Sequence, residues 1–174
     1  LSIYPSNHNH WQAVCKTITK SYKNITKNFS ELFQSSDDNL LYSIRNDIKR
    51  SEEQLLYLIH NDGSCCQTQE EKEELEMHAR RIERILYVFA KVNPNFGYIQ
   101  GFNELIIPLY YVMYSASNLF FNKIEYVEAV SYEAFAFLLI SSDLSDFFNI
   151  DLSVCENKLL PFNHVLSRQM PKTY

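Results

Sequence analysis

Apolar residues recur every three or four positions along most of this chain. The first stripe runs from Trp11 through Ile18 and Ile25 to Phe33, and later stripes continue to Leu166. Side chains with this spacing share one face of an α-helix, and that face is buried against neighbouring helices. No segment shows a convincing period of two, the alternation that is typical of half-buried strands. The pattern therefore predicts an all-α fold without a sheet.

The stretch 93–104 interrupts this pattern and reads Asn-Pro-Asn-Phe-Gly-Tyr-Ile-Gln-Gly-Phe-Asn-Glu. Pro94 disfavours helical dihedral angles at the residue before it, so the preceding helix is predicted to end there. Gly97 and Gly101 are two of only three glycines in 174 residues. Their closeness indicates either positive φ angles or the close approach of another chain. Gln100, between them, offers two hydrogen-bond donors and an acceptor, which makes this stretch a candidate site.

A second polar pattern lies at 44–51, within a helix that the apolar spacing predicts, and reads Ile-Arg-Asn-Asp-Ile-Lys-Arg-Ser. The spacing of three places Asp47 and Arg50 on the same side of that helix. One interpretation is a solvated surface ion pair, which would contribute only about 0.3–0.5 kcal/mol. The other is a functional pair. Taken alone, the spacing favours the surface ion pair.

Together, the two strings resemble the signature motifs of the TBC domain, the GTPase-activating domain for Rab GTPases. The family writes them roughly as I-x-x-D-x-x-R-T and N-P-x-x-G-Y-x-Q-G-M-N, and this chain departs from them at Ser51 and Phe102. Serine keeps the hydroxyl of threonine, and phenylalanine keeps the apolar character of methionine. The flanking strings ERILYVFAKVNP and NELIIPLYY are similar to the thirteenth-numbered member type. Two signatures in the right order favour a functional site over an isolated ion pair.

The resemblance implies an all-α, TBC/RabGAP-type helical domain that stimulates GTP hydrolysis by a Rab-family GTPase. By this resemblance, Arg50 is the arginine finger, Gln100 is a glutamine finger that replaces the GTPase's own, and Asp47 orients the arginine. Residues expected to contact the partner are Tyr98, Gly101 and Asn103. GTP and Mg²⁺ would belong to the partner GTPase, so no cofactor of the chain's own is expected.

The competing hypothesis is a helical interaction module that binds a small GTPase or a trafficking partner without catalysis. Some family members lack one finger and fit that description, whereas both finger positions, Arg50 and Gln100, are present here. The resemblance covers the first part of a TBC domain. We therefore interpret residues 1–174 as its N-terminal portion, with the C-terminal portion absent. Apolar surface left uncovered in this way would favour self-association of the fragment.

Composition excludes several other classes of function. The net charge is −5 with no basic run, which argues against a nucleic-acid partner or an anionic membrane surface. The longest uncharged run, 105–121, is slightly short of the roughly 20 apolar residues that a spanning helix needs. Three glycines cannot build a phosphate loop. The five histidines are scattered and the four cysteines form no CxxC, so we expect no metal site, and reduced thiols in a cytoplasmic protein.

Several boundaries can also be predicted. The first helix is expected to continue to about Phe33, and residues 60–74 to form a polar, mobile segment. Residues 105–113 are apolar all round, which predicts a central buried helix. Further helices are expected at 126–142, 143–151 and 154–166.

Overall fold

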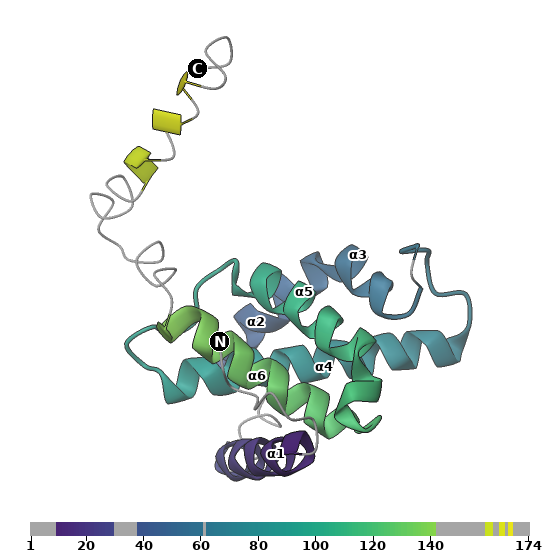
Figure 1. Ribbon diagram of the computed structural model, residues 1–174. Coiled ribbons are helices and arrows are strands. Elements are labelled where there is room, and N and C mark those ends of the chain that lie inside the picture. The colour runs from purple at the N-terminus through teal and green to yellow at the C-terminus, as the bar shows by residue number, and fades with distance from the viewer. Residues whose placement is uncertain are drawn as a thin grey trace. The chain divides into compact units, whose positions relative to one another are not determined.

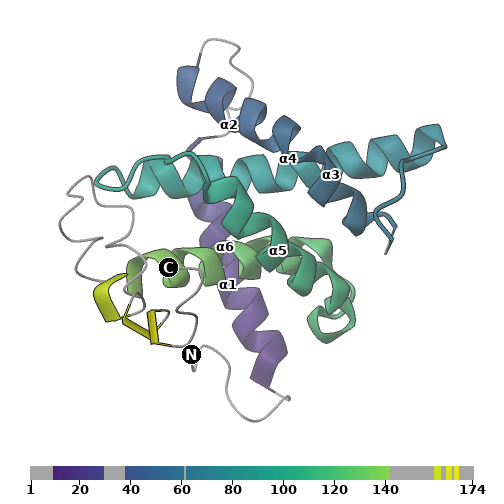
Figure 2. The same cartoon turned by 90° about the horizontal axis from the view of Figure 1, so that it is seen from above.

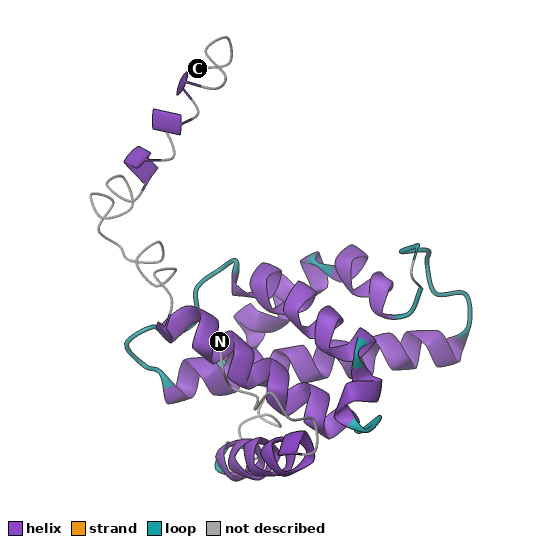
Figure 3. Cartoon of the chain, in the orientation of Figure 1, coloured by secondary structure: helices purple, strands orange, loops and turns teal. Residues whose placement is uncertain are grey.

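The computed structural model describes residues 10–29, 38–60, 62–141 and three short pieces, 159–161, 164–165 and 167–168. Within these residues every regular element is a helix and none is a strand, which confirms the all-α prediction (Figures 1 and 3). The elements are α1 (Trp11–Lys27), α2 (Asn39–Arg50), α3 (Glu52–Leu55), the 3₁₀ turn η3 (Leu56–Leu58), α4 (Gln69–Val92), α5 (Phe102–Ser115), the 3₁₀ turn η4 (Ser117–Phe120) and α6 (Ile124–Ser141).

The chain divides into two compact units, Leu1–Phe135 and Ala136–Tyr174. Both sequence motifs lie in the first unit. The helix expected at 143–151 and most of the one expected at 154–166 fall outside the described residues. Among the described helices, none is long and apolar enough to cross a membrane.

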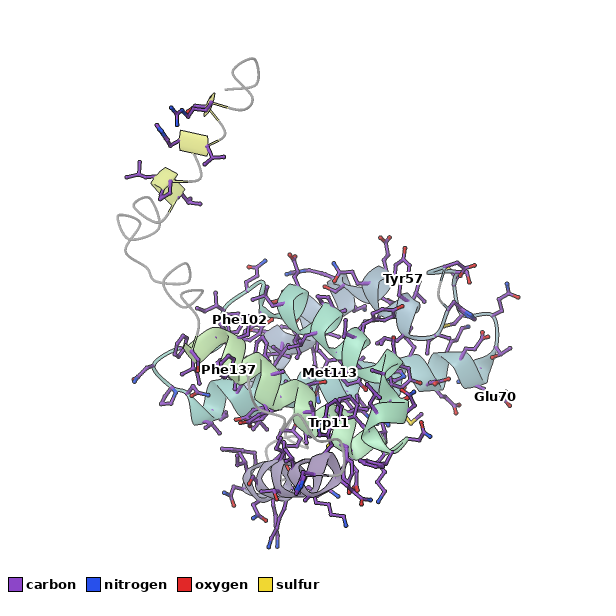
Figure 4. The ribbon with its side chains drawn as sticks, in the orientation of Figure 1. Trp11, Tyr57, Glu70, Phe102, Met113 and Phe137 are labelled. Carbon is purple, nitrogen blue, oxygen red and sulfur yellow. The ribbon has the colours of Figure 1, made fainter. Side chains whose placement is uncertain are left out.

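Helix α4 forms the centre of the first unit and contacts α1, α2, α3 and α5. Its residues 85–90 are all buried, which shows that the helix is covered on every side there. The ring of Phe89 meets those of Phe102 and Phe135 edge to face, with centroids 5.9 and 5.1 Å apart. These aromatic contacts tie α4 to the start of α5, where Phe102 is fully buried (Figure 4), and they add to the stability gained from apolar burial.

A buried polar cluster joins α1 to the same core. Glu128 on α6 accepts hydrogen bonds from Tyr22 Oη at 2.9 Å and from both Nε and Nη2 of Arg84, at 2.6 and 2.7 Å. Burying a carboxylate is costly unless its oxygens are paired, and here a bidentate guanidinium and a hydroxyl supply the partners. The cluster fixes α1 where it crosses α4 and the beginning of α6 (Figure 2).

Two predicted boundaries are wrong. Helix α1 ends at Lys27 and a turn follows it, so Phe29 is not helical; Phe33 lies outside the described residues. The polar segment 60–74 already contains the beginning of α4 at Gln69, because Thr68 and Glu71 form a capping box that starts the helix.

Helix α5 is not buried all round, contrary to the prediction from its apolar sequence. Glu104, Pro108 and Val112 are exposed along one side, while Ile106, Ile107 and Tyr110 are buried on the other. Pro108 lies within the helix and lacks an N–H, which leaves the carbonyl oxygen of Glu104 without its helical donor. The exposure of both residues lets water reach that oxygen. The helix therefore tolerates a proline on its solvent-exposed side.

Candidate functional site

The first motif occupies the last two turns of α2. Asp38 caps the start of this helix by accepting from the backbone N–H of Leu40 at 2.9 Å, and it also accepts from Tyr87 Oη of α4 at 2.5 Å. The Ile44 side chain is fully buried further along. With these anchors the helix presents Arg50 at its C-terminal end, where the arginine side chain is 69% exposed.

The second motif lies in the connection between α4 and α5. Helix α4 ends at Val92 as predicted, and Asn93 closes it by donating from Nδ2 to the carbonyl oxygen of Phe89 at 3.0 Å. Gly97 and Gly101 have φ angles of 61° and 103°. A Cβ atom at either position would meet no atom within 4 Å. The two glycines therefore adopt the positive φ that the sequence indicated, and the space beside them is open to another chain.

Hydrogen bonds join the two motifs, although they lie about fifty positions apart in the chain. Tyr98 Oη donates to Asp47 Oδ2 at 2.8 Å. Asn103 Nδ2 donates to Ser51 Oγ at 2.8 Å and lies 3.4 Å from the Asp47 carbonyl oxygen. Asn103 Oδ1 in turn accepts from the N–H of Gly101 at 3.2 Å. The retained hydroxyl of Ser51 is thus a hydrogen-bond partner, as expected of a serine in the threonine position.

Arg50 and Gln100 line one cleft of about 480 Å³, together with Asp47, Gly101 and Asn103. Asp47 holds the arginine through a 2.8 Å bond from Nη1 to Oδ1. Gln100 is exposed in the turn just before α5. The structure therefore brings together five of the six residues singled out in the sequence.

Tyr98, the sixth residue, is not among those that line the cleft. Its hydroxyl is directed at Asp47, so its observed contact is with the residue that holds Arg50. Burial, with the hydrogen bond to Asp47 beside it, raises the pKa of Tyr98 well above its usual value. The hydroxyl consequently remains protonated, and a donor to Asp47, at neutral pH.

Sequence reasoning missed two polar residues of the cleft, Gln54 and Glu104. Glu104 stands next to Asn103 in the second motif, and that adjacency was the available signal. Gln54 lies on α3, just after the first motif, and no sequence signal marked it as a site residue. A larger cleft of about 730 Å³ between α2, α3 and α4 contains none of the six predicted residues.

Chemically, the smaller cleft is lined by an exposed guanidinium and an exposed neutral amide. The guanidinium fork suits phosphate oxygens. The amide can donate to one group while accepting from another. The neighbouring carboxylate of Asp47 is engaged by Arg50 and Tyr98. Such a site suits an anionic group and a water molecule that are presented by another molecule.

The family model of the Rab-GTPase-TBC domain matches residues 6–174. The chain belongs to this family. A segment of 39 residues is 54% identical to a TBC domain-containing protein of Schizosaccharomyces pombe and covers 22% of this chain and 6% of that protein. A segment of 82 residues is 37% identical to TBC1 domain family member 13 of Mus musculus and of Homo sapiens. It covers 46% of this chain and 20% of each relative. No solved structure matches the chain.

The matched parts thus amount to a fifth or less of the length of these TBC relatives. The resemblance recognised in the two motifs is confirmed at the level of the TBC family, and the likeness to the thirteenth-numbered member is supported over less than half of the chain. The roles of Arg50, Gln100, Asp47, Tyr98, Gly101 and Asn103 stay predictions.

Proposed function

We propose that this chain stimulates GTP hydrolysis by a Rab-family GTPase and supplies Arg50 and Gln100 in trans. The observation that carries the proposal is the convergence of both side chains on one cleft. A transferring phosphoryl group has to touch both residues at once, which requires them to converge. The membership of the TBC family supports the class of partner.

In the proposed mechanism, Arg50 leaves Asp47 and reaches the nucleotide held by the partner. GTP hydrolysis spreads negative charge over the oxygens of the transferring phosphoryl group. A guanidinium placed there stabilises that charge through paired hydrogen bonds. For GTPases in general, an arginine supplied in this way accelerates hydrolysis by roughly 10³–10⁵-fold.

Gln100 would orient the attacking water. Its side-chain oxygen can accept a hydrogen bond from the water while its amide nitrogen donates one to a phosphate oxygen. The positive φ of Gly101, at the N-terminal end of α5, fixes the backbone next to this side chain. GTP and Mg²⁺ are brought by the partner GTPase, and a cytoplasmic location would give access to it.

The test is GTP turnover by a panel of Rab GTPases with the wild-type chain and with Arg50→Lys and Gln100→Ala. We expect Arg50→Lys to bind the same Rab and lose most of the stimulation, because lysine keeps the charge but not the bidentate fork. Arg45→Lys is the matched control, since Arg45 lies on the same helix but pairs with Glu83 outside the site.

A non-catalytic interaction module is the alternative. It predicts that the wild-type chain binds a Rab without accelerating turnover, so that Arg50→Lys changes neither binding nor rate. If Arg50→Lys stimulates hydrolysis as well as wild type does, Arg50 is not the finger.

A further inference from the structure

We propose that His60, Cys66 and Glu71 form a zinc site in the connection between η3 and α4. Each offers one ligand atom, and the three atoms lie within 4.8 Å of one another. All three residues are partly buried. The site lies on other residues than the Arg50 cleft and is independent of the proposed GTPase activation.

Local hydrogen bonds fold this connection back on itself. The N–H of His60 donates to the carbonyl oxygen of Leu56 at 2.8 Å, which continues the turn of η3. The N–H of Gly63 then donates to the carbonyl oxygen of His60 at 2.9 Å. Gly63 has a φ of 70°, and a Cβ atom there would lie 2.7 Å from Cζ of Tyr57. The chain therefore turns tightly over the Tyr57 ring and returns Cys66 to the neighbourhood of His60.

The carboxylate of Glu71 uses one oxygen in the capping box, and its other oxygen faces His60. Its Oε2 accepts from the N–H of Gln67 at 2.7 Å and from the N–H of Thr68 at 3.0 Å, as part of the capping box of α4. Its Oε1 lies 3.5 Å from Nε2 of His60. The first turn of α4, where Figure 4 labels Glu70, thus brings an oriented carboxylate oxygen toward the imidazole.

The imidazole nitrogen of His60 supplies the second, independent observation. Nε2 is buried and makes no hydrogen bond, and its contact with Oε1 of Glu71 is long at 3.5 Å. A buried polar atom without a partner costs free energy, and an ion or a water molecule at the site removes that cost. Thr19 Oγ1 and His78 Nε2 are also buried without a hydrogen-bond partner, but only His60 belongs to a cluster of possible metal ligands in the described part of the chain. A cation could be bound by Nε2, by Oε1 of Glu71 and by the thiolate of Cys66, whose thiol proton is released to solvent on binding.

The donor set favours zinc over the alkaline-earth ions. One imidazole nitrogen, one sulfur and one carboxylate oxygen are the ligand types that Zn²⁺ takes, whereas Mg²⁺ and Ca²⁺ take oxygen. Tetrahedral zinc with bonds of about 2.0–2.3 Å places its ligand atoms roughly 3.3–3.8 Å apart. The 3.5 Å between Nε2 and Oε1 already meets that spacing. The sulfur of Cys66 lies within 4.8 Å of both atoms and needs to move closer by at most about 1.5 Å. The fourth position is left to water.

The experiment is a titration of the metal-stripped full chain with Zn²⁺ in competition with a chromophoric chelator. We expect one equivalent of zinc to bind to the wild-type chain. Cys66→Ser and Glu71→Gln should each weaken zinc binding at least about tenfold, since even outer ligand partners contribute 10–100-fold. Glutamine also completes a capping box, so Glu71→Gln removes the anionic ligand while it keeps the start of α4.

Cys65→Ser is the matched control, because Cys65 is the adjacent, exposed cysteine and does not belong to the cluster. It should bind zinc as wild type does, and Co²⁺ should give thiolate-to-metal absorption with wild type and Cys65→Ser but not with Cys66→Ser. Far-ultraviolet circular dichroism of the metal-free variants checks that each is folded. No stoichiometric binding to wild type, or equal loss in Cys65→Ser and Cys66→Ser, would overturn the proposal.

Discussion

Asp47 holds two neighbours through its two carboxylate oxygens, and we expect the two bonds to differ in strength. Tyr98 Oη donates to Oδ2 and Arg50 Nη1 donates to Oδ1, both at 2.8 Å. Tyr98 is half-buried and its ring packs edge to face on Phe102, whereas the Arg50 side chain is 69% exposed. A hydrogen bond to a buried charged group contributes about 1.5–3 kcal/mol, and an exposed ion pair about 0–1 kcal/mol.

Tyr98→Phe should therefore lower the free energy of unfolding by about 1.5–2 kcal/mol, the lower part of that range, because the tyrosine is only half-buried. Phenylalanine keeps the ring contact and removes only the hydroxyl. Arg50→Ala should cost less than about 1 kcal/mol. The Asp47 side chain itself is 9% exposed, so water replaces the lost tyrosine donor poorly and the lost arginine donor, on the open side, more readily.

Urea unfolding followed by far-ultraviolet circular dichroism measures the loss of unfolding free energy in both variants. Equal slopes of this free energy against urea concentration show that the variants unfold comparably. Tyr42→Phe is the control, because Tyr42 lies on the same helix with 65% of its surface exposed and should change stability by less than about 0.5 kcal/mol. The double variant reports the coupling through the shared carboxylate. If Arg50→Ala costs as much as Tyr98→Phe, the arginine is not loosely held, and its proposed departure from Asp47 toward a nucleotide loses its energetic basis.

Two further predictions concern stability. Burial, and secondarily the charge of Arg81, lowers the pKa of His78 to about 4 against the opposing effect of Glu74, so the unfolded chain binds more protons than the folded one between pH 6.5 and 4. The free energy of unfolding then decreases as pH falls through that window, by up to about 3 kcal/mol. Urea unfolding at pH 7.5 and 4.5 should show a smaller decrease for His78→Gln than for wild type. An equal decrease in the two proteins would contradict this assignment. Thr68→Ala should cost about 1 kcal/mol through the capping box of α4, and Thr68→Ser should cost nearly nothing; equal midpoints of urea unfolding for the two variants would show that the cap is not the cause.

The fold class and the two motifs could be predicted because both depend on local sequence. Helical periodicity is a property of neighbouring positions, and the end of α4 follows from the restriction that Pro94 places on the residue before it. The positive φ of Gly97 and Gly101 was one of the two demands that the sequence indicated, and the structure shows it together with open space beside both residues.

The missed boundaries have two different physical causes. The first turns of α4, from Gln69, carry no apolar stripe because they face solvent, although the Thr68 and Glu71 pair was a readable capping signature. Apart from Pro108, nothing in the sequence indicated that one side of α5 is exposed. Folded proteins leave many apolar residues on their surface, and the sequence does not show which of the apolar residues of α5 these are.

The partners of Tyr98 and Asn103 were beyond sequence reasoning for another reason. Their bonds reach Asp47 and Ser51 across about fifty positions, and spacing along one helix says nothing about contacts with another. The sequence assigned Tyr98 and Asn103 to contacts with an outside partner, and that role stays a prediction. The contacts that the structure shows for both residues lie within the chain.

These internal contacts separate the fixed parts of the site from the free ones. Asn103 is 5% exposed and Ser51 is 7% exposed, so their 2.8 Å bond joins the end of α2 to the start of α5 away from water. That bond sets the distance between the backbone positions from which Arg50 and Gln100 depart. The two side chains themselves are exposed, and we expect the contact of Arg50 with Asp47 to be weak. A side chain that acts on another molecule needs this combination. A fixed backbone reduces the entropy lost on docking, and a weak contact in the unbound protein leaves the end of the side chain free to move.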